Sequence, residues 1–295
     1  MTAVSRGLVQ KVRRTETLPY WLVIPTLVYL AVFFVSPMVQ AFRLAFESEG
    51  GGWTLANFDR MINDADFGRA LRFTLLLVVI VVPLQFVVAL AMALVVNAKL
   101  RFRGVFLYIY LLPLAISDLA AGIVWYAIFT ERGYLNTLLE GVGLIDQAII
   151  WINPQRGGFL LGEVMIAELW RSTALVMVVL VAGLQGIPKE YGEAAEVFGA
   201  GWFQRLRKVT LPMLKPALSV AILLRTVLAF EVFSTVLAIT GRGATVLPAE
   251  AWRWQTDLRE PNIAASYATL ILVLTLAAAV LILRVFRTPR EQMVR

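Results

Sequence analysis

The chain has 295 residues, of which 59% are hydrophobic and 16% charged, and its formal net charge is +7. Soluble globular domains carry about a quarter charged residues, so this composition excludes an ordinary soluble protein. The sequence contains no cysteine or histidine, which excludes disulfides, thiolate or imidazole metal ligands and histidine-based catalytic triads.

Six apolar segments are long enough to cross a membrane as helices. Residues 17–42, 73–98 and 261–283 contain no charged side chain, and about 20 apolar residues span a bilayer. Three further segments are apolar on either side of an internal charge. The sequence therefore predicts an all-α polytopic membrane protein with six transmembrane helices. Their approximate ranges are 19–41, 73–96, 105–129, 164–186, 216–240 and 262–284.

These helices divide the chain into three parts. Residues 1–18 are expected to form a cytoplasmic arm, because they are polar and basic and lead into an apolar run too long for a cleavable signal peptide. Residues 19–286 are expected to form the membrane domain, which includes a long cytoplasmic loop at 187–215. Residues 287–295 are expected to form a cytoplasmic tail.

The distribution of Lys and Arg indicates the orientation in the membrane. Sixteen of them lie in the N-terminal arm, the second and fourth connecting loops and the C-terminal tail, against nine in the other three loops. Basic residues favour the cytoplasmic side, so both termini are expected in the cytoplasm. The net charge is explained as a determinant of topology, and no nucleic-acid partner is expected.

Two of the loops on the other side predict short amphipathic helices. Apolar and acidic residues mix at 53–67, which predicts a helix lying on the membrane surface. A second helix is predicted by Leu135, Leu138, Leu139 and Val142, which follow helical spacing.

The segment 190–212 is polar and interrupted, whereas its surroundings are apolar. A short helix is expected there, with Glu193 in its first turns, where the helix dipole favours anions. Gly199 and Gly201 are expected to end it in a left-handed or strained turn. A second helix is expected to follow and to end before Pro212, which starts the next span.

The spacing in this segment resembles the EAA motif of ABC importer permeases, EAA-x3-G-x9-I-x-LP. One position departs from the motif, where valine replaces isoleucine. The matching residues are Glu193, Ala194, Ala195, Gly199, Val209, Leu211 and Pro212.

Short elements extend the resemblance over nearly the whole chain, to the first permease partner of carbohydrate-uptake systems of the maltose, trehalose and glycerol-3-phosphate type. Arg242 stands where their TGGG turn has a glycine, and Ala174 stands where the family often has proline. The similar elements are WTLANF at 53–58, RGVF at 103–106 with LP at 112–113, AGLQGIP at 182–188, RT and FEVF within 225–233, and TGRG at 240–243.

The resemblance implies a type I ABC importer permease fold and a transport mechanism. In such importers the EAA helix docks in a cleft of an ATPase. Glu193 would pair there with a basic group, Ala194 and Ala195 would permit close docking, and Gly199 would allow the turn. The implied partners are a second permease subunit, two ABC ATPase subunits, an extracytoplasmic solute-binding protein and a sugar, a di- or oligosaccharide.

No cofactor is expected on this chain. The sequence lacks a phosphate-binding GxxxxGK[ST] loop, so ATP and Mg are expected to be used by the partner ATPases. The chain is therefore expected to be a transport subunit and not an enzyme.

Polar residues within the spans are candidates for the substrate path, because ionisable groups in a membrane are costly and usually face the interior of the helix bundle. Glu231 has Ser234 and Thr235 at i+3 and i+4, with Phe230 and Phe233 close by in the sequence. These residues suit a patch that faces a sugar. Interhelical hydrogen bonding explains them equally well.

Four further candidates for the substrate path have the same open alternative. Ser172 and Thr173 lie in the fourth span, and Ser117 and Asp118 lie in the third. Each could contact a substrate or bond to a neighbouring helix.

Three other charged residues in the spans are expected to have structural partners. Arg225 and Glu231 are six residues apart and face different sides of a helix, so Arg225 is expected to pair with another helix. Glu168 and Arg171 are at i, i+3 and are expected to neutralise each other.

Two other classes of function stay open. A self-contained secondary carrier or channel would transport without partners, which leaves the EAA-like spacing unexplained. An intramembrane enzyme would need a catalytic site, and the sequence contains no GxGD or HExxH motif.

Overall fold

The computed structural model describes residues 20–48, 50–98, 101–153, 155 and 157–286. Within these ranges the chain is helical, with one isolated bridge between Glu47 and Trp53 and no β-strand. The predicted all-α class is confirmed. The predicted arm 1–18 and tail 287–295 lie outside the described residues.

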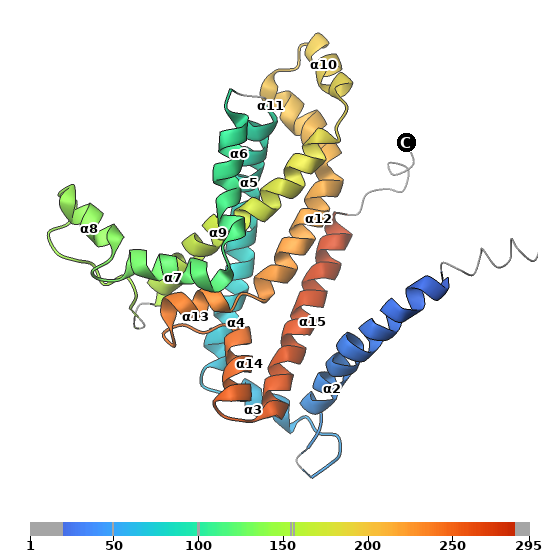
Figure 1. The fold of residues 1–295 in the computed structure, drawn as a ribbon, viewed down its shortest axis with the longest axis vertical. Helices are drawn as coiled ribbons and strands as arrows, with labels where there is room; N and C mark the ends of the chain where they lie inside the picture. The colour runs from blue at the N-terminus through green and yellow to red at the C-terminus, as the bar shows by residue number, and fades with distance from the viewer. Residues whose placement is uncertain (1–19, 49, 99–100, 154, 156, 287–295) are drawn as a thin grey trace, which may run out of the picture.

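Five helices of the described chain are long and apolar enough to cross a membrane, and a bent helix pair makes a sixth candidate span. The five are Tyr20–Ala45, Phe67–Asn97, Gly158–Gln185, Trp202–Phe230 and Pro261–Val285. In the labels of Figure 1, they contain α2 (Ser36–Ala45), α4 (Phe67–Leu76), α5 (Val82–Asn97), α9 (Gly157–Gln185), α11 (Trp202–Arg205), α12 (Leu211–Phe230) and α15 (Pro261–Val285).

The predicted third span is a bent pair of helices. α6 (Arg103–Leu111) continues into the 3-10 turn η3 (Leu112–Ala115), and α7 (Asp118–Phe129) follows after a bend of 101°. Pro113 lacks the N–H that a continuing helix needs. Ser117 has an extended backbone and caps α7, because its hydroxyl accepts a hydrogen bond from the Ala120 amide at 3.2 Å. A single straight helix over 105–129 is therefore wrong.

The predicted fifth span, 216–240, is also wrong in its limits. The helix runs without interruption from Trp202 to Phe230, through α11, the π-helical stretch η4 (Leu206–Thr210) and α12. Pro212 therefore lies inside this helix and does not start it. The chain breaks at residues 231–233, and α13 (Ser234–Thr240) follows as a separate helix.

Each π-helical stretch in the described chain is followed within two residues by proline. Pro37 follows η1 (Ala31–Val35), Pro83 follows η2 (Leu77–Val81), and Pro212 follows η4. Proline removes a hydrogen-bond donor and crowds the preceding turn, and a widened turn accommodates both effects. The long helices thus continue through their prolines.

The interior is built where α5, α9 and α12 pack together. Small residues set the closest approaches: a Cβ added to Gly183 on α9 would lie 2.4 Å from the Ala217 Cβ on α12. A Cβ added to Gly122 on α7 would lie 2.6 Å from the Ala238 Cβ on α13. Small residues let membrane helices approach closely, and these glycines do so here.

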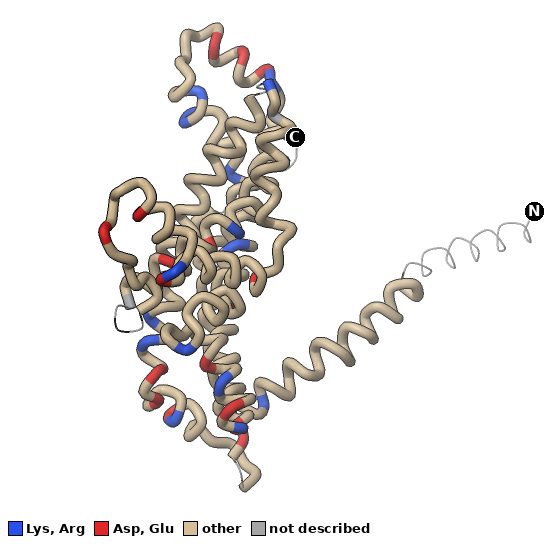
Figure 2. Tube along the Cα trace, turned by 60° about the vertical axis from the view of Figure 1, so that its left-hand side comes forward, with Lys and Arg blue, Asp and Glu red and all other residues tan. Residues whose placement is uncertain are grey.

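The long helices end at two poles. α10 (Lys189–Val197) stands at one end, and α3 (Ala56–Ile62) and α14 (Leu247–Thr256) lie at the other (Figure 1). Figure 2 shows charged residues gathered at both poles, with a smaller group between them. These ends are called below the α10 pole and the α14 pole.

Both short helices predicted for the loops are present, as α3 and α8 (Tyr134–Gly141). The apolar side of α3 packs on protein, however, because Met61 is buried in a cluster with Leu247, Ile263 and Tyr267. Packing on protein therefore explains this apolar side, and the location of α3 at the membrane surface stays a prediction.

The first long helix stands apart from the others. Its C-terminal part, α2, packs against α15, while the rest leans away from the body (Figure 1). No residue of its most apolar stretch is buried. Its apolar side chains are thus available to lipid or to another membrane protein.

Candidate functional site

The EAA-like segment forms a helix with a glycine turn. α10 ends in a Schellman motif, in which the Ala200 amide donates to the Ala195 carbonyl and the Gly199 amide donates to the Glu196 carbonyl, each at 2.9 Å. Gly199 has φ +79°, a left-handed conformation that favours glycine. Gly201 has φ −66° and instead precedes α11 in an extended conformation. The predicted turn therefore depends on Gly199 alone.

Apolar side chains are exposed around this turn. Val197 is 86% exposed and Phe198 is 90% exposed, and Trp202 and Phe203 are also mostly exposed. These four residues belong to α10, α11 and the turn between them, at the end of the molecule (Figure 1). Exposed apolar patches mark interaction surfaces, so this pole has the character of a docking site.

The other residues of the EAA-like segment lie on both sides of the turn. Glu193 and Ala194 are exposed on α10, and Ala195 is half-buried. The two helices are joined by an ion pair between Glu196 and Arg205, 2.9 Å apart. The last three motif residues belong to the long helix: Val209 in η4 and Leu211 and Pro212 at the start of α12.

A buried charge network connects three helices between the poles. Arg225 on α12 is 1% exposed. Its Nη2 donates to the Glu168 carboxylate at 2.9 Å, and its Nε donates to the Gln85 side-chain oxygen at 2.6 Å. The Gln85 amide in turn donates to the Glu168 carbonyl at 2.7 Å. Arg225 therefore has its partners on α9 and α5, and the prediction of a partner on another helix is confirmed.

The predicted Glu168–Arg171 pair is secondary to other contacts. Those two side chains are 3.6 Å apart, whereas Glu168 is 2.9 Å from Arg225 and Arg171 is 2.7 Å from Asp118. Asp118 is the first residue of α7, and its side chain is 53% exposed. The network therefore extends from the interior to the surface through Arg171 and Asp118.

Four of the predicted substrate-path residues are buried within the chain. The Ser172 hydroxyl donates to the Glu168 carboxylate at 3.1 Å, and the Thr173 hydroxyl donates to the Leu169 carbonyl. The Thr235 hydroxyl donates to the Asp118 carbonyl at 3.4 Å, and Phe230 is buried. Ser117, the cap of α7, is exposed beside Asp118.

The predicted Glu231 patch is divided by the break in the helix. Glu231 ends α12 and Ser234 begins α13, so these side chains do not share a helix face as the i+3 spacing predicted. Glu231 is exposed, and its side chain has no hydrogen bond or ion pair with another described residue. With Phe233 it lines a groove of about 590 Å³ beside small residues of α15 such as Ala265 and Ala268.

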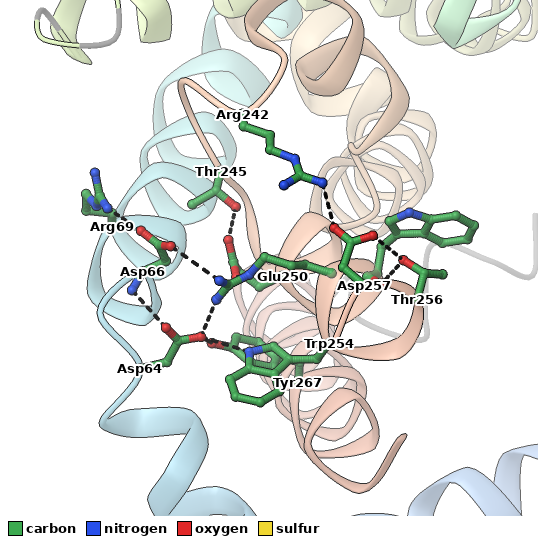
Figure 3. Close-up of polar contacts among 12 residues, drawn as sticks. Asp64, Asp66, Arg69, Arg242, Thr245, Glu250, Trp254, Thr256, Asp257 and Tyr267 are labelled. Carbon is green, nitrogen blue, oxygen red and sulfur yellow. Dashed lines mark hydrogen bonds and ion pairs between the residues drawn. The ribbon is translucent and has the colours of Figure 1, made fainter. Parts of the chain in front are cut away.

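The α14 pole contains a polar network that the sequence did not predict (Figure 3). Arg253 on α14 lies 2.6 Å from Glu250 and 2.5 Å from Asp64. The Asp64 carboxylate also accepts hydrogen bonds from the Trp254 indole at 2.8 Å and the Tyr267 hydroxyl at 3.3 Å. The only sequence signal was the i, i+3 spacing of Glu250 and Arg253.

This network sets the ionisation of Asp64. Burial acts to raise the pKa of Asp64, but it is outweighed by hydrogen bonds from the Asp66 amide and the Trp254 indole and by the charge of Arg253. The pKa of Asp64 is therefore held below its ordinary value. The carboxylate stays charged and anchors α14 to the segment between α3 and α4.

No group of three or more acidic side chains in the described part of the chain is placed to hold a metal ion. The charged groups are instead joined to one another in the networks above.

Comparison with known proteins identifies the family. Residues 85–291 match the family described as "binding-protein-dependent transport system inner membrane component". The trehalose/maltose transport system permease protein MalF of Thermococcus litoralis is 29% identical over 300 residues, which cover 98% of this chain and 100% of that protein. The trehalose transport system permease protein SugA of Mycobacterium tuberculosis is 35% identical over 206 residues, covering 69% of this chain and 64% of that protein.

A solved structure has the same fold. A chain of a bacterial ABC transporter involved in the import of the acidic polysaccharide alginate aligns with a TM-score of 0.79 at 21% identity, covering 95% of this chain and 98% of that one. The type I ABC importer permease fold is therefore confirmed. With the family match covering well over half of its length, the chain belongs to the binding-protein-dependent transport-system inner membrane components, which are the permease subunits of ABC importers.

Proposed function

We propose that this chain is the sugar-translocating permease subunit of an ATP-driven importer, with a di- or oligosaccharide as its cargo. The relatives named as trehalose/maltose, trehalose and lactose permeases support the sugar class. The chain of Rhizobium radiobacter named as the lactose permease is 29% identical over 283 residues, covering 90% of this chain and 94% of that protein.

The observation that carries the proposal is the form of the α10 pole. Glu193 and Ala194 are exposed on a short helix that ends in the turn at Gly199, with exposed apolar side chains on both sides of the turn. A helix presented in this way suits docking in a cleft of a partner. That partner would be one of two cytoplasmic ABC ATPase subunits. Those subunits, and not this chain, would bind and use ATP and Mg.

The long helix Trp202–Phe230 supplies a route from this pole to the interior. Arg205, near its start, is paired with Glu196 of α10. Arg225, about 30 Å further along by helix rise, holds α9 and α5 through Glu168 and Gln85. A force on α10 would therefore reach the helix interface that holds the bundle together.

The proposed orientation places the α10 pole in the cytoplasm and the α14 pole outside. This orientation is supported by the sixteen Lys and Arg in the arm, the second and fourth connecting loops and the tail, against nine in the other three loops. An extracytoplasmic solute-binding protein would deliver the sugar at the α14 pole. A second permease subunit would complete the path through the inner membrane, and the exposed first long helix offers it an apolar surface.

Burial reduces the number of residues in this chain that are candidates for the substrate path. Ser172, Thr173 and Thr235 are buried and hydrogen-bonded to their own chain. The exposed candidates are Asp118 with Ser117, and Glu231. We expect Glu231→Ala to lower sugar uptake and to leave the ATPase subunits bound, and uptake equal to wild type would make Glu231 a structural residue.

The function is tested by comparing the chain alone with the assembled importer in proteoliposomes. Alone, it should neither transport a sugar nor hydrolyse ATP. With its second permease, ATPases and binding protein, ATP hydrolysis should rise when the binding protein is loaded with sugar. Uptake by the chain alone would instead support the second candidate, a self-contained carrier or channel.

The coupling role is tested by Glu193→Lys, with Glu140→Lys as the matched control. Both glutamates are exposed, and Glu140 lies on α8, away from the α10 pole. Glu193→Lys should abolish uptake while the sugar-loaded binding protein still binds the complex. Equal uptake in the two variants would refute the assignment of α10 as the ATPase contact.

A further inference from the structure

A cavity of about 610 Å³ lies at the α14 pole, and of the elements that the motifs singled out it includes only Phe233 and the turn at 241–243. Its walls come from α4, the start of α9, α13, the turn at 241–245 and α14. Cavities of about 300–1,000 Å³ are typical of small-molecule sites. The volume is therefore large enough for a small organic ligand.

One of the arginines that line the cavity has no acidic partner. It contains four arginines and three carboxylates, and each carboxylate is paired with an arginine. The pairs are Asp66 with Arg69, Glu250 with Arg253 and Asp257 with Arg242. The side chain of Arg72, one helical turn after Arg69 on α4, has no ion pair or hydrogen bond with any described residue. The cavity therefore holds one guanidinium without a counter-charge.

A second arginine of the lining makes only an exposed ion pair. Arg242 stands on the turn between α13 and α14, and its side chain is 85% exposed. Its single partner is Asp257 at 2.8 Å (Figure 3). Because exposed ion pairs contribute little free energy, an incoming anion can share or replace Asp257. Arginine binds carboxylate and phosphate groups in a two-pronged geometry that suits this role.

An aromatic pair forms the remaining part of the wall. The rings of Phe233 and Trp252 lie 5.9 Å apart, and both residues line the cavity. Trp252 is more than half exposed. A sugar ring has an apolar face of C–H groups that packs on an aromatic surface. Guanidinium groups beside an aromatic wall therefore suit a ligand with both a sugar ring and an anion.

We propose that this cavity is an outer subsite for a saccharide that carries an anionic group, a carboxylate or a phosphate ester. Arg72 and Arg242 hold the anion, and the Phe233–Trp252 pair packs against the sugar ring. The inference rests on the proposed function as a sugar permease and specifies the chemical class of its cargo. A lipid phosphate shares the anionic chemistry, so the test separates the two sources.

The test measures binding to the full-length chain in phosphatidylcholine nanodiscs, without ATP, by isothermal titration calorimetry. The probes are trehalose, trehalose 6-phosphate and inorganic phosphate. Trehalose 6-phosphate should bind about tenfold more tightly than trehalose, as one added charged hydrogen bond gives, and more tightly than inorganic phosphate. Equal affinities for the two sugars would overturn the anionic class.

Variants localise the site. Arg72→Gln and Arg242→Gly should each remove most of the preference for the phosphorylated sugar, whereas Trp252→Leu should weaken both sugars alike. Arg132→Gln is the matched control, because Arg132 is exposed between α7 and α8 and does not line the cavity. An equal loss in Arg132→Gln would overturn the location.

Two outcomes identify the competing source. Inorganic phosphate binding as tightly as trehalose 6-phosphate, or loss of sugar binding when phosphatidylglycerol is added to the nanodiscs, would assign the arginines to lipid phosphate and overturn the proposal. The function itself is tested separately by sugar-stimulated ATP hydrolysis. If the assembled importer takes up a neutral sugar with ATP, but the chain binds trehalose 6-phosphate no more tightly than trehalose, this inference is refuted and the proposed function stands.

Discussion

The two poles of the molecule are stabilised in different ways. At the α14 pole, Arg253 joins Asp64 and Glu250, and the short helices α3 and α14 pack on α15. At the α10 pole, one ion pair between Glu196 and Arg205 joins two short helices whose apolar side chains are exposed. The α14 pole thus joins its short helices through a buried charge network and an apolar cluster, whereas the α10 pole has one exposed ion pair and leaves apolar side chains for a partner.

This difference separates residues that maintain shape from residues that act on a partner. Substitutions at the α14 pole should change the free energy of unfolding. Substitutions at the α10 pole should change transport and leave stability nearly unaltered. The four predictions below test that division.

The largest effect is expected at Gly199. Gly199→Val places a β-branched side chain at φ +79°, and left-handed backbone costs such a residue about 1–2 kcal/mol. Because nothing lies within 4 Å of an added Cβ, the cost is in the backbone and the turn should rearrange. ATP-driven uptake should fall at least tenfold. Gly199→Asn should retain most uptake, because Asn tolerates this conformation, and equal losses in both variants would contradict the argument.

Next in size is Arg253→Met at the α14 pole. It leaves the carboxylates of Asp64 and Glu250 without their shared partner, and breaking such a pair costs about 3 kcal/mol when it is buried. Denaturant titration of the purified chain measures the loss. Arg242→Met, which removes an exposed pair, should cost less than about 1 kcal/mol. Similar losses in the two variants would show that the network does not stabilise this pole.

A smaller effect is expected from acidification. The pKa of Asp64 is lower in the folded chain than in the unfolded chain. The charged carboxylate therefore contributes its full stabilisation above the ordinary pKa of Asp, about 3.9. This stabilisation is lost as the pH falls through the pKa of the folded chain. The difference in unfolding free energy between wild type and Asp64→Asn should be constant from about pH 5 to 8 and shrink below about pH 4. A difference that shrinks near neutral pH would contradict this assignment.

The smallest effect is expected for the ion pair of the α10 pole. A double-mutant cycle with Glu196→Gln and Arg205→Gln isolates their interaction. Glu196 is mostly exposed, so the coupling energy for unfolding should be below about 1 kcal/mol. A coupling as large as that of Arg253 with Asp64 would remove the contrast between the poles.

Local patterns in the sequence predicted local structure well. The glycine turn after α10 followed from the spacing of Gly199, and the membrane helices followed from charge-free runs. The bend before α7 carried a signal in Pro113 and Ser117 that the continuous hydropathy concealed. The break at residues 231–233 contains neither glycine nor proline, so no local rule marks it.

Contacts between residues that are distant in the sequence were harder to predict. The position of Arg225 in an apolar span required a polar partner, but only the packing of α5, α9 and α12 determines that the partners are Gln85 and Glu168. Asp64 and Arg253 meet because α3 and α14 pack on the same helix, and their separation along the chain follows no spacing rule. The lining of the cavity depends on the same tertiary arrangement.

The uninterrupted helix Trp202–Phe230 has a mechanical consequence. Its 29 residues form a lever about 43 Å long. Pivoting it by about 5° near Arg205 would displace Arg225 by about 2.6 Å, since the two residues are about 30 Å apart along the axis. That displacement matches the lengths of the hydrogen bonds that Arg225 makes, 2.6 and 2.9 Å. If α5 and α9 stay in place, a small rotation at the α10 pole would therefore separate Arg225 from Glu168 and Gln85.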